Sequence, residues 1–153
     1  MTLSFDLIAE ADGWPEADQL SDVIAKTLDA LACEQKLSEG RRICFLFTDD
    51  IAMAELNGLH RGRSRPTNVL SFPAHESAED ELGDIAFGRE TVFREAHEKS
   101  ISVIDHVAHL VVHGVLHLLG YDHETQLEAE TMEAIERGTL SRIGIADPYL
   151  GER

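Results

Sequence analysis

The stretch HGVLHLLGYDH, from His113 to His123, constrains the fold more than any other part of the chain. It closes a long apolar run whose helical spacing predicts a buried helix. His113 and His117 are four residues apart, so on a helix they lie on one face and both imidazoles can reach one ion. Gly120 is a typical helix-ending residue, and a turn there would bring His123 back toward the same ion.

Three imidazoles at this spacing predict a catalytic metal site. They supply three neutral nitrogen ligands and leave a tetrahedral ion one open position for water, whereas a structural zinc site normally has a fourth protein ligand. Packing of core histidines is the alternative, and it accounts poorly for three of them with the glycine in place. We therefore interpret His113, His117 and His123 as ligands of one Zn²⁺ ion. His109 lies two turns from His117, about 11 Å along the axis, and is interpreted as a residue that supports the site without binding the ion.

The motif resembles that of metzincin-type zinc proteases but differs at Gly114, where those enzymes carry a catalytic glutamate. Glycine has no side chain to accept a proton from water, which argues against a peptidase of that type. A phosphodiester suits the site better, because a metal and an arginine can both stabilise negative charge on phosphate oxygens. The stretch from His60 to Phe72 has no acid and supplies three arginines. Arg61 is expected to bind the phosphate, and His60, Arg63 and Arg65 to contact the substrate.

Composition and charge narrow the class of protein. The formal net charge of −16 argues against broad attraction to nucleic acid, so a polyanionic substrate must engage a local basic patch. The N-terminus lacks the features of a signal peptide, and Asp105 with several histidines interrupts the longest apolar run, so we expect a cytoplasmic protein without a membrane span. Cys33 and Cys44 lack metal or redox spacing and are expected to be reduced core residues.

Hydrophobic patterning predicts one α+β domain over residues 1–153, with a sandwich-like mixed sheet of about four strands, about five helices and the metal site at the end of the long central helix. The expected strands are residues 3–10, 42–48, 68–73 and 82–88, and the expected helices are residues 17–31, 50–59, 89–99, 101–120 and 126–143. The continuous apolar run of residues 42–48 is typical of a strand covered on both faces. Thr125 and Glu128 have the spacing of a capping box.

Four motifs, in order along the chain, resemble the YbeY family of bacterial endoribonucleases, which are ribosomal RNA maturation factors. They are LN…R (Leu56, Asn57 and Arg61), RPTNVLSFP (Arg65 to Pro73), LGDI (Leu82 to Ile85) and AHLVVHGVLHLLGYDH (Ala108 to His123). The resemblance implies that His113, His117 and His123 bind zinc and that Arg61 lies at the metal cleft and is needed for activity. It implies a single-strand-preferring endoribonuclease in 16S rRNA 3′-end maturation and ribosome quality control, with the small ribosomal subunit and its assembly factors as partners.

Several residues of these motifs carry secondary expectations. His60 stands where family members often have an aromatic residue, and Arg65 where many have lysine, which bears on substrate preference. Asp84 is expected to orient a ligand or hold a turn, and Asp122 to tie down the loop that carries His123. Ser71 and Phe72 are expected to pack beside the cleft.

Two other functions remain open from the sequence. One is a metal-dependent hydrolase of another substrate, peptides included, by a route that does without the glutamate. The other is a non-catalytic ribosome-assembly factor whose zinc site is structural.

Overall fold

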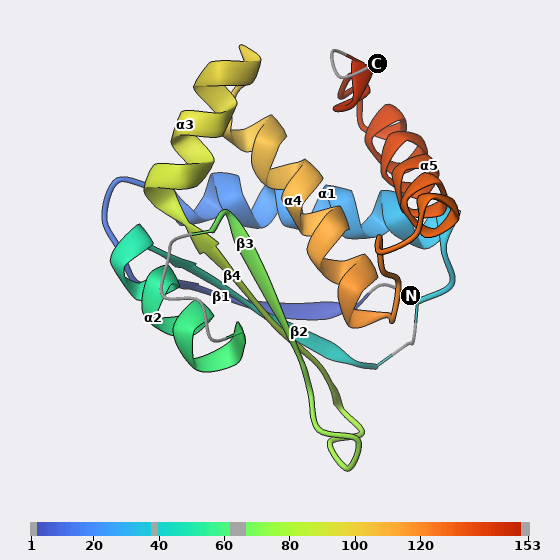
Figure 1. The fold of residues 1–153 in the computed structure, drawn as a ribbon, viewed down its shortest axis with the longest axis horizontal. Coiled ribbons are helices and arrows are strands. Elements are labelled where there is room, and N and C mark those ends of the chain that lie inside the picture. The colour runs from blue at the N-terminus through green and yellow to red at the C-terminus, as the bar shows by residue number, and fades with distance from the viewer. Residues whose placement is uncertain (1–2, 38–39, 62–66, 151–153) are drawn as a thin grey trace.

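The computed structural model describes residues 3–37, 40–61 and 67–150, and this part of the chain forms a four-stranded sheet and five helices (Figure 1). The strands are β1 (Ser4–Ala9), β2 (Arg42–Thr48), β3 (Val69–Pro73) and β4 (Glu81–Gly88). The helices are α1 (Ala17–Glu34), α2 (Asp50–Arg61), α3 (Arg89–Lys99), α4 (Val103–Leu118) and α5 (Gln126–Arg142). These elements confirm the expected α+β class and the order of strands and helices.

The sheet is mixed, and β3 lies at one edge. Its strand order is β1-β2-β4-β3, with β1, β2 and β4 parallel and β3 antiparallel to β4. Ser71 pairs with Ile85 across the antiparallel pair. Successive side chains of a strand point to opposite faces, so Val69, Ser71 and Pro73 share the face of β3 that looks toward α4.

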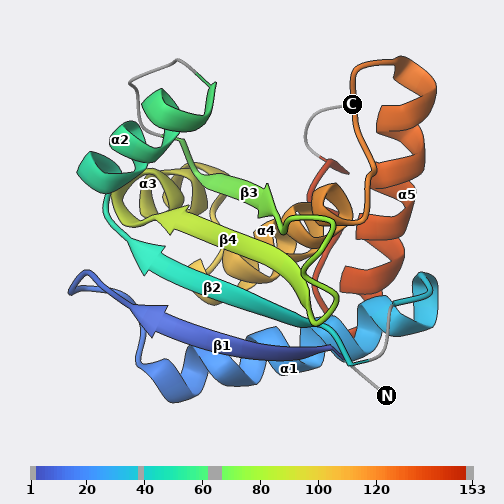
Figure 2. The ribbon, with the colours of Figure 1, turned by 90° about the horizontal axis from the view of Figure 1, so that it is seen from below.

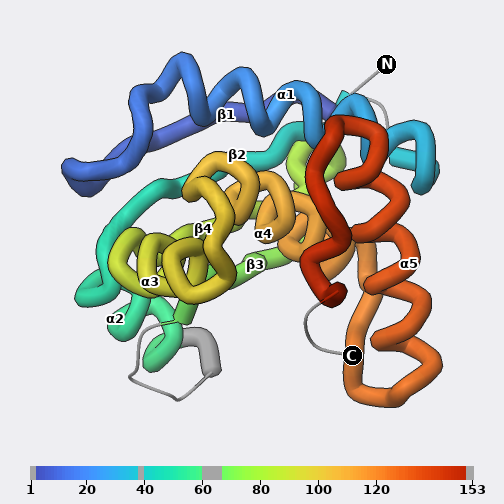
Figure 3. The backbone as a smooth tube through the Cα atoms, turned by 90° about the horizontal axis from the view of Figure 1, so that it is seen from above, coloured from blue at the N-terminus to red at the C-terminus, as the bar shows by residue number. Residues whose placement is uncertain are grey.

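Helices α1, α3 and α4 lie on one face of the sheet, with α4 in the middle, packed against β3 and β4, and α5 packs on α1 and α4 (Figures 2 and 3). The core between the layers contains fully buried Phe45, Phe47 and Phe87, the last two stacked with ring centroids 4.6 Å apart. Among the described residues no single helix is long and apolar enough to span a membrane, and the pair α3 and α4 reaches that length only together and is bent by 112°.

Among the described residues, the opposite face of the sheet is covered only in part, by α2. Met53 of α2 packs there on Leu70 and Ala86, with Phe72 beside them. Arg42 is exposed and Cys44 is half-buried, so the expectation that residues 42–48 are covered on both faces was wrong. The α2 helix packs on only one end of this face, so it covers Leu46 but leaves Arg42 and Cys44 accessible to solvent.

Two smaller expectations also fail. Phe72 belongs to the α2 face of the sheet and not to the cleft, because it alternates with Ser71 along β3. Cys33 is exposed, because it lies off the buried stripe of α1. Both cysteines are free thiols.

Side-chain caps fix the helix starts near the site. Asp49 accepts a hydrogen bond from the backbone N–H of Ala52 at 2.9 Å and so caps the N-terminus of α2. The capping box of Thr125 and Glu128 is present at the start of α5, as its spacing predicted. Asp50 accepts hydrogen bonds from the backbone and hydroxyl of Thr91, which joins the start of α2 to the start of α3. The position of the α2 helix on the sheet is thereby fixed from its N-terminal end.

Candidate metal centre and its cleft

The end of α4 turns the chain back on itself through Gly120. The N–H of Tyr121 bonds to the carbonyl of Leu116 at 3.0 Å and the N–H of Gly120 to that of His117 at 3.0 Å. This pair of bonds is the Schellman motif, and Gly120 supplies the left-handed residue it needs, with φ of +99°. The Tyr121 hydroxyl donates to Gln35 at the end of α1. The turn that carries His123 is therefore anchored at both the helix end and a neighbouring helix.

His113, His117 and His123 come together as their spacing predicted. One ligand nitrogen from each lies within 4.8 Å of the others, and the ring centroids are 4.6 to 5.6 Å apart. The Nε2 atoms of His113 and His117 are 3.1 Å apart. Two nitrogens that share a tetrahedral zinc ion at 2.0–2.1 Å would be separated by about 3.3 Å. The histidine group therefore has the composition and spacing to hold one metal ion.

The two helical histidines have their outer nitrogens engaged. Nδ1 of His113 lies 2.8 Å from Oε2 of Glu136, and Nδ1 of His117 lies 3.0 Å from the backbone oxygen of Tyr121. Both partners are acceptors, so a neutral imidazole at either position carries its proton on Nδ1 and leaves a lone pair on Nε2. Burial, followed by the neighbouring His113 and His123, lowers the pKa of His117 below its usual value. Its imidazole is thus held in the neutral form that ligates metals.

Glu136 of α5 is a buried carboxylate behind the site. Its side chain is 0% exposed and contacts histidines on two successive turns of α4. Oε2 accepts from His113, while Oε1 accepts from Nε2 of His109 at 3.2 Å and from the hydroxyl of Tyr149. Burial alone would raise the pKa of Glu136, but the hydrogen bonds from His109 and His113 outweigh it and lower the pKa to about 2. The group is a carboxylate anion at neutral pH.

Acid should weaken the metal-free fold through Glu136. A carboxyl group whose pKa is lowered by folding stabilises the fold at every pH above its pKa in the unfolded chain, here 4.5. This contribution is lost as the pH falls toward the pKa in the folded protein, about 2. The loss amounts to roughly 3 kcal/mol. Urea unfolding of the metal-free protein between about pH 5 and about pH 2 measures it. The Glu136→Gln variant should show a shallower pH dependence than the wild type, and equal slopes would contradict the assignment.

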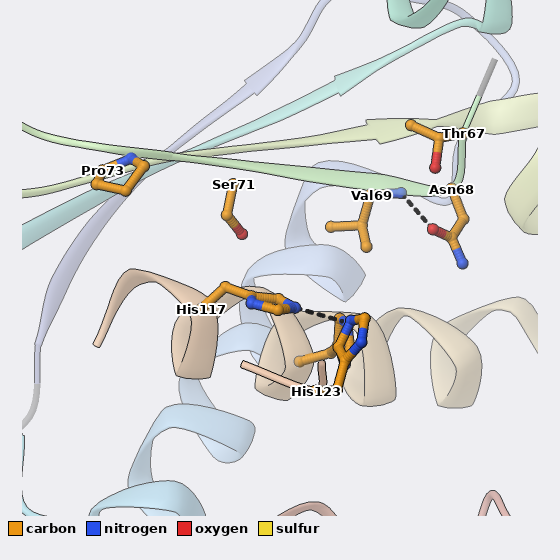
Figure 4. A pocket seen from close by; sticks show the side chains of 8 residues that line it. Thr67, Asn68, Val69, Ser71, Pro73, His117 and His123 are labelled. Atoms are coloured by element: carbon orange, nitrogen blue, oxygen red, sulfur yellow. Dashed lines mark hydrogen bonds between the residues drawn. The ribbon is translucent and has the colours of Figure 1, made fainter. Parts of the chain in front are cut away.

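The histidine group forms one wall of an open cleft of about 400 Å³. The other wall is β3 and the residues before it, which contribute Thr67, Asn68, Val69, Ser71 and Pro73 (Figure 4). The side chain of Asn68 is fixed by two bonds, to Glu95 of α3 at 3.0 Å and to the N–H of Val69 at 2.7 Å. None of the described lining residues carries a carboxylate. The described lining of the cleft therefore lacks the negative side chains that are abundant in the rest of this acidic protein.

Gly114 sits where α4 touches the sheet. A Cβ atom there would lie 3.0 Å from Cδ1 of Ile85 and 3.2 Å from Oγ of Ser71, closer than ordinary contact. The Ser71 hydroxyl also donates to the Gly114 carbonyl at 2.9 Å. Glycine at this position, which interrupts the protease motif, therefore permits the close approach of α4 to the sheet, in addition to lacking a proton acceptor.

Restoring the protease glutamate should harm the fold. In Gly114→Glu a long acidic side chain must enter the contact between α4 and Ile85, and overpacking of this kind costs about 1–3 kcal/mol before any cost of charge burial. Chemical unfolding should show this loss, and peptide substrates should remain uncleaved. Ala134→Glu, at an exposed position of α5, is the matched control and should unfold like the wild type. Stable folding of Gly114→Glu would contradict the packing role.

The remaining predicted site residues fall into three groups. His109 bonds to Glu136, and its ring lies edge-on to that of His113 with centroids 6.5 Å apart, but it is not part of the histidine group. Asp122 accepts from the N–H of His123 at 2.7 Å, within the turn. Asp84 does not reach the cluster: its neighbour Ile85 faces Gly114, so Asp84 points to the opposite face of the sheet, where it is exposed. The backbone of α2 includes His60 and Arg61, but their side chains, and Arg63 and Arg65 altogether, lie outside the described residues.

Sequence reasoning missed Glu136, which contacts a predicted ligand. A signal was present in α5, because Glu136 shares the buried stripe of that helix with Met132, Thr139 and Leu140. An acid on a buried helical stripe needs a partner, and the available partners are histidines of α4.

Comparison with known proteins places the chain in one family. The family model described as Endoribonuclease YbeY matches residues 9–144. A Bartonella henselae protein named Endoribonuclease YbeY is 44% identical over 156 residues, covering 96% of this chain and 97% of its own length. A Maricaulis maris protein of the same name is 42% identical and covers 96% of this chain and 92% of its own length. The solution structure of TM1509 from Thermotoga maritima superposes with a TM-score of 0.59 at 26% identity, covering 91% of each chain. The chain belongs to the YbeY family.

Proposed function

We propose that this protein is a zinc-dependent endoribonuclease that prefers single-stranded RNA and acts in 16S rRNA 3′-end maturation and ribosome quality control. Its partners would be the small ribosomal subunit and its assembly factors, and residues 1–153 would form one hydrolase domain. Family membership supports the endoribonuclease activity. The observation that carries the metal dependence is the convergence of three imidazole nitrogens within 4.8 Å at an open cleft.

His113, His117 and His123 would hold the ion, with the first two presenting Nε2. Bound there, zinc would supply Lewis acidity for activating water and for stabilising charge on the phosphate. Three protein ligands are typical of a catalytic site because a position stays open for water or substrate. This feature favours an enzyme over a protein whose zinc is only structural.

The cleft suits an extended anionic chain. Its described lining contains no carboxylate, so a phosphate approaching the histidines meets no acidic side chain among these residues. Arg61, at the end of α2, would bind the scissile phosphate through its guanidinium, which matches phosphate oxygens in pairs. His60, Arg63 and Arg65 would contact neighbouring nucleotides. The acidic remainder of the surface would keep bulk RNA away from other faces.

Cleavage assays with purified protein test the activity. Single-stranded RNA, the matching duplex and a peptide panel would be incubated with protein as purified, after chelation and after zinc is restored. We expect cleavage of the single strand, loss on chelation and recovery with zinc. Cleavage that survives complete removal of metal would reject zinc dependence, and hydrolysis of peptides alone would reject the substrate class.

The cellular role needs a separate measurement. Mapping of rRNA ends in cells depleted of the protein should show 16S rRNA with an extended 3′ end. Recovery of normal ends by an inactive variant would favour a binding function over catalysis.

A further inference from the structure

The carboxylate of Glu136 has a fixed set of contacts that the proposed reaction does not use. It is fully buried, lies on α5 and reaches across to two histidines of α4. A buried carboxylate is costly unless donors satisfy its oxygens, and three do so here: His109, His113 and Tyr149. Of these only His113 belongs to the metal-binding group.

The hydrogen bond between Glu136 and His113 determines which nitrogen of that imidazole faces the metal site. A carboxylate only accepts, so the proton of the neutral ring must lie on Nδ1, and the lone pair must lie on Nε2. That Nε2 atom is the one found 3.1 Å from Nε2 of His117. With the ring held at 2.8 Å on its other side, rotation about the side chain would break the bond to Glu136. The imidazole is therefore oriented before any ion arrives.

Glu136 is in turn held by residues remote from the ion. His109 and Tyr149 both bond to Oε1, which leaves Oε2 directed at His113. Tyr149 lies in the short segment after α5, and its backbone N–H is fixed by Asp147 at 2.8 Å. The arrangement joins the C-terminal segment, α5 and α4 in one hydrogen-bonded chain that ends at a metal ligand.

We propose that Glu136 is a positioning residue of the metal centre: its carboxylate fixes the orientation and tautomer of His113 and places a negative charge behind the ligand that tightens metal binding. Carboxylates that orient ligating histidines in this way change metal affinity by about 10- to 100-fold when removed. The inference rests on the proposed metal site but is separate from the RNA-cleaving activity.

Metal affinity is the decisive measurement. Competition with a chromophoric chelator gives dissociation constants for Zn²⁺ and Co²⁺, and the visible absorption of bound Co²⁺ reports the geometry of the site. The wild type would be compared with Glu136→Gln, which keeps the size and loses the charge, and with Glu136→Leu, which also loses the hydrogen bond. Tyr149→Phe removes one support of Glu136 without touching His113. Glu130→Gln, an exposed position on the same helix, is the matched control.

We expect affinity to fall by about 10-fold in Glu136→Gln and by up to about 100-fold in Glu136→Leu, with an altered Co²⁺ spectrum in both. Tyr149→Phe should have a smaller effect, and Glu130→Gln none. A purely structural role would lower the unfolding free energy of the metal-free protein but leave the affinity and spectrum of the folded variants unchanged.

Two results would overturn the inference and are distinguishable. If the wild type binds metal and folded Glu136→Gln binds it equally with the same spectrum, the positioning role is wrong and the metal site stands. If the wild type binds no metal, the proposed metal site is wrong and the inference falls with it. Should Glu136→Leu fail to fold, Glu136→Gln still decides, because it nearly preserves the volume of the buried side chain.

Discussion

Replacing His117 with alanine is expected to remove metal binding and RNA cleavage together. His117 is the middle ligand in the sequence: its Nε2 faces that of His113 at 3.1 Å, and its ring centroid lies 5.1 Å from that of His123. Loss of one of three protein ligands leaves two, fewer than a catalytic zinc site uses. Removing a residue that only hydrogen-bonds to a ligand lowers metal affinity by about 10- to 100-fold, so removing a ligand itself should lower it by more than about 100-fold.

Metal content of the purified variant and its rate on single-stranded RNA check this expectation. His97→Ala is the matched control, because His97 is an exposed histidine on α3 outside the metal-binding group. It should keep wild-type metal content and activity. A metal-free His117→Ala protein that cleaves RNA at the wild-type rate would separate the histidine group from catalysis.

The metal ligands could be predicted because the contacts that join them are local. His113 and His117 meet through the spacing of one helical turn, and His123 returns through a turn that Gly120 makes possible. All three lie within eleven residues of chain. The strands and helices were likewise predicted from periodicity and capping, which are also local properties.

Glu136 and the packing of Gly114 depend on tertiary arrangement, which a single sequence does not specify. Glu136 meets His113 only because α5 packs on α4, and Gly114 meets Ile85 only because α4 lies on β4. Sequence reasoning therefore explained the glycine by the side chain it lacks. The structure adds that the side chains of Ile85 and Ser71 lie closer to the position of a Cβ atom than ordinary contact allows.

Asp84 was expected to orient a ligand or to hold a turn, and the structure contradicts the first of these two roles. Its motif contains Ile85, which does contact α4 beside the histidines. Because neighbouring residues of a strand point to opposite faces, the same contact turns Asp84 away. The motif thus combines a packing residue with an exposed acid, and the two differ in which face of the sheet their side chains occupy.

Replacing Arg61 with alanine is expected to reduce the RNA cleavage rate by about 10²- to 10³-fold, the usual effect of losing one donor that stabilises transition-state charge. Metal affinity should stay at the wild-type level, because Arg61 ends α2 and the ligands belong to α4 and the turn after it. The two substitutions therefore separate the roles: His117→Ala loses metal and rate, and Arg61→Ala loses rate alone. Arg61→Lys should recover only part of the rate, since an ammonium group lacks the paired geometry of guanidinium toward phosphate.

Single-turnover cleavage of the same RNA, with metal content measured in parallel, checks this second expectation. Arg94→Ala is the matched control, because Arg94 is an exposed arginine on α3 and its substitution removes the same positive charge. If both arginine variants lose rate equally, the effect is general electrostatic attraction and not a contact with the scissile phosphate. If Arg61→Ala cleaves like the wild type, phosphate binding must be assigned elsewhere in the cleft, and the nearest cations in the sequence are Arg63 and Arg65.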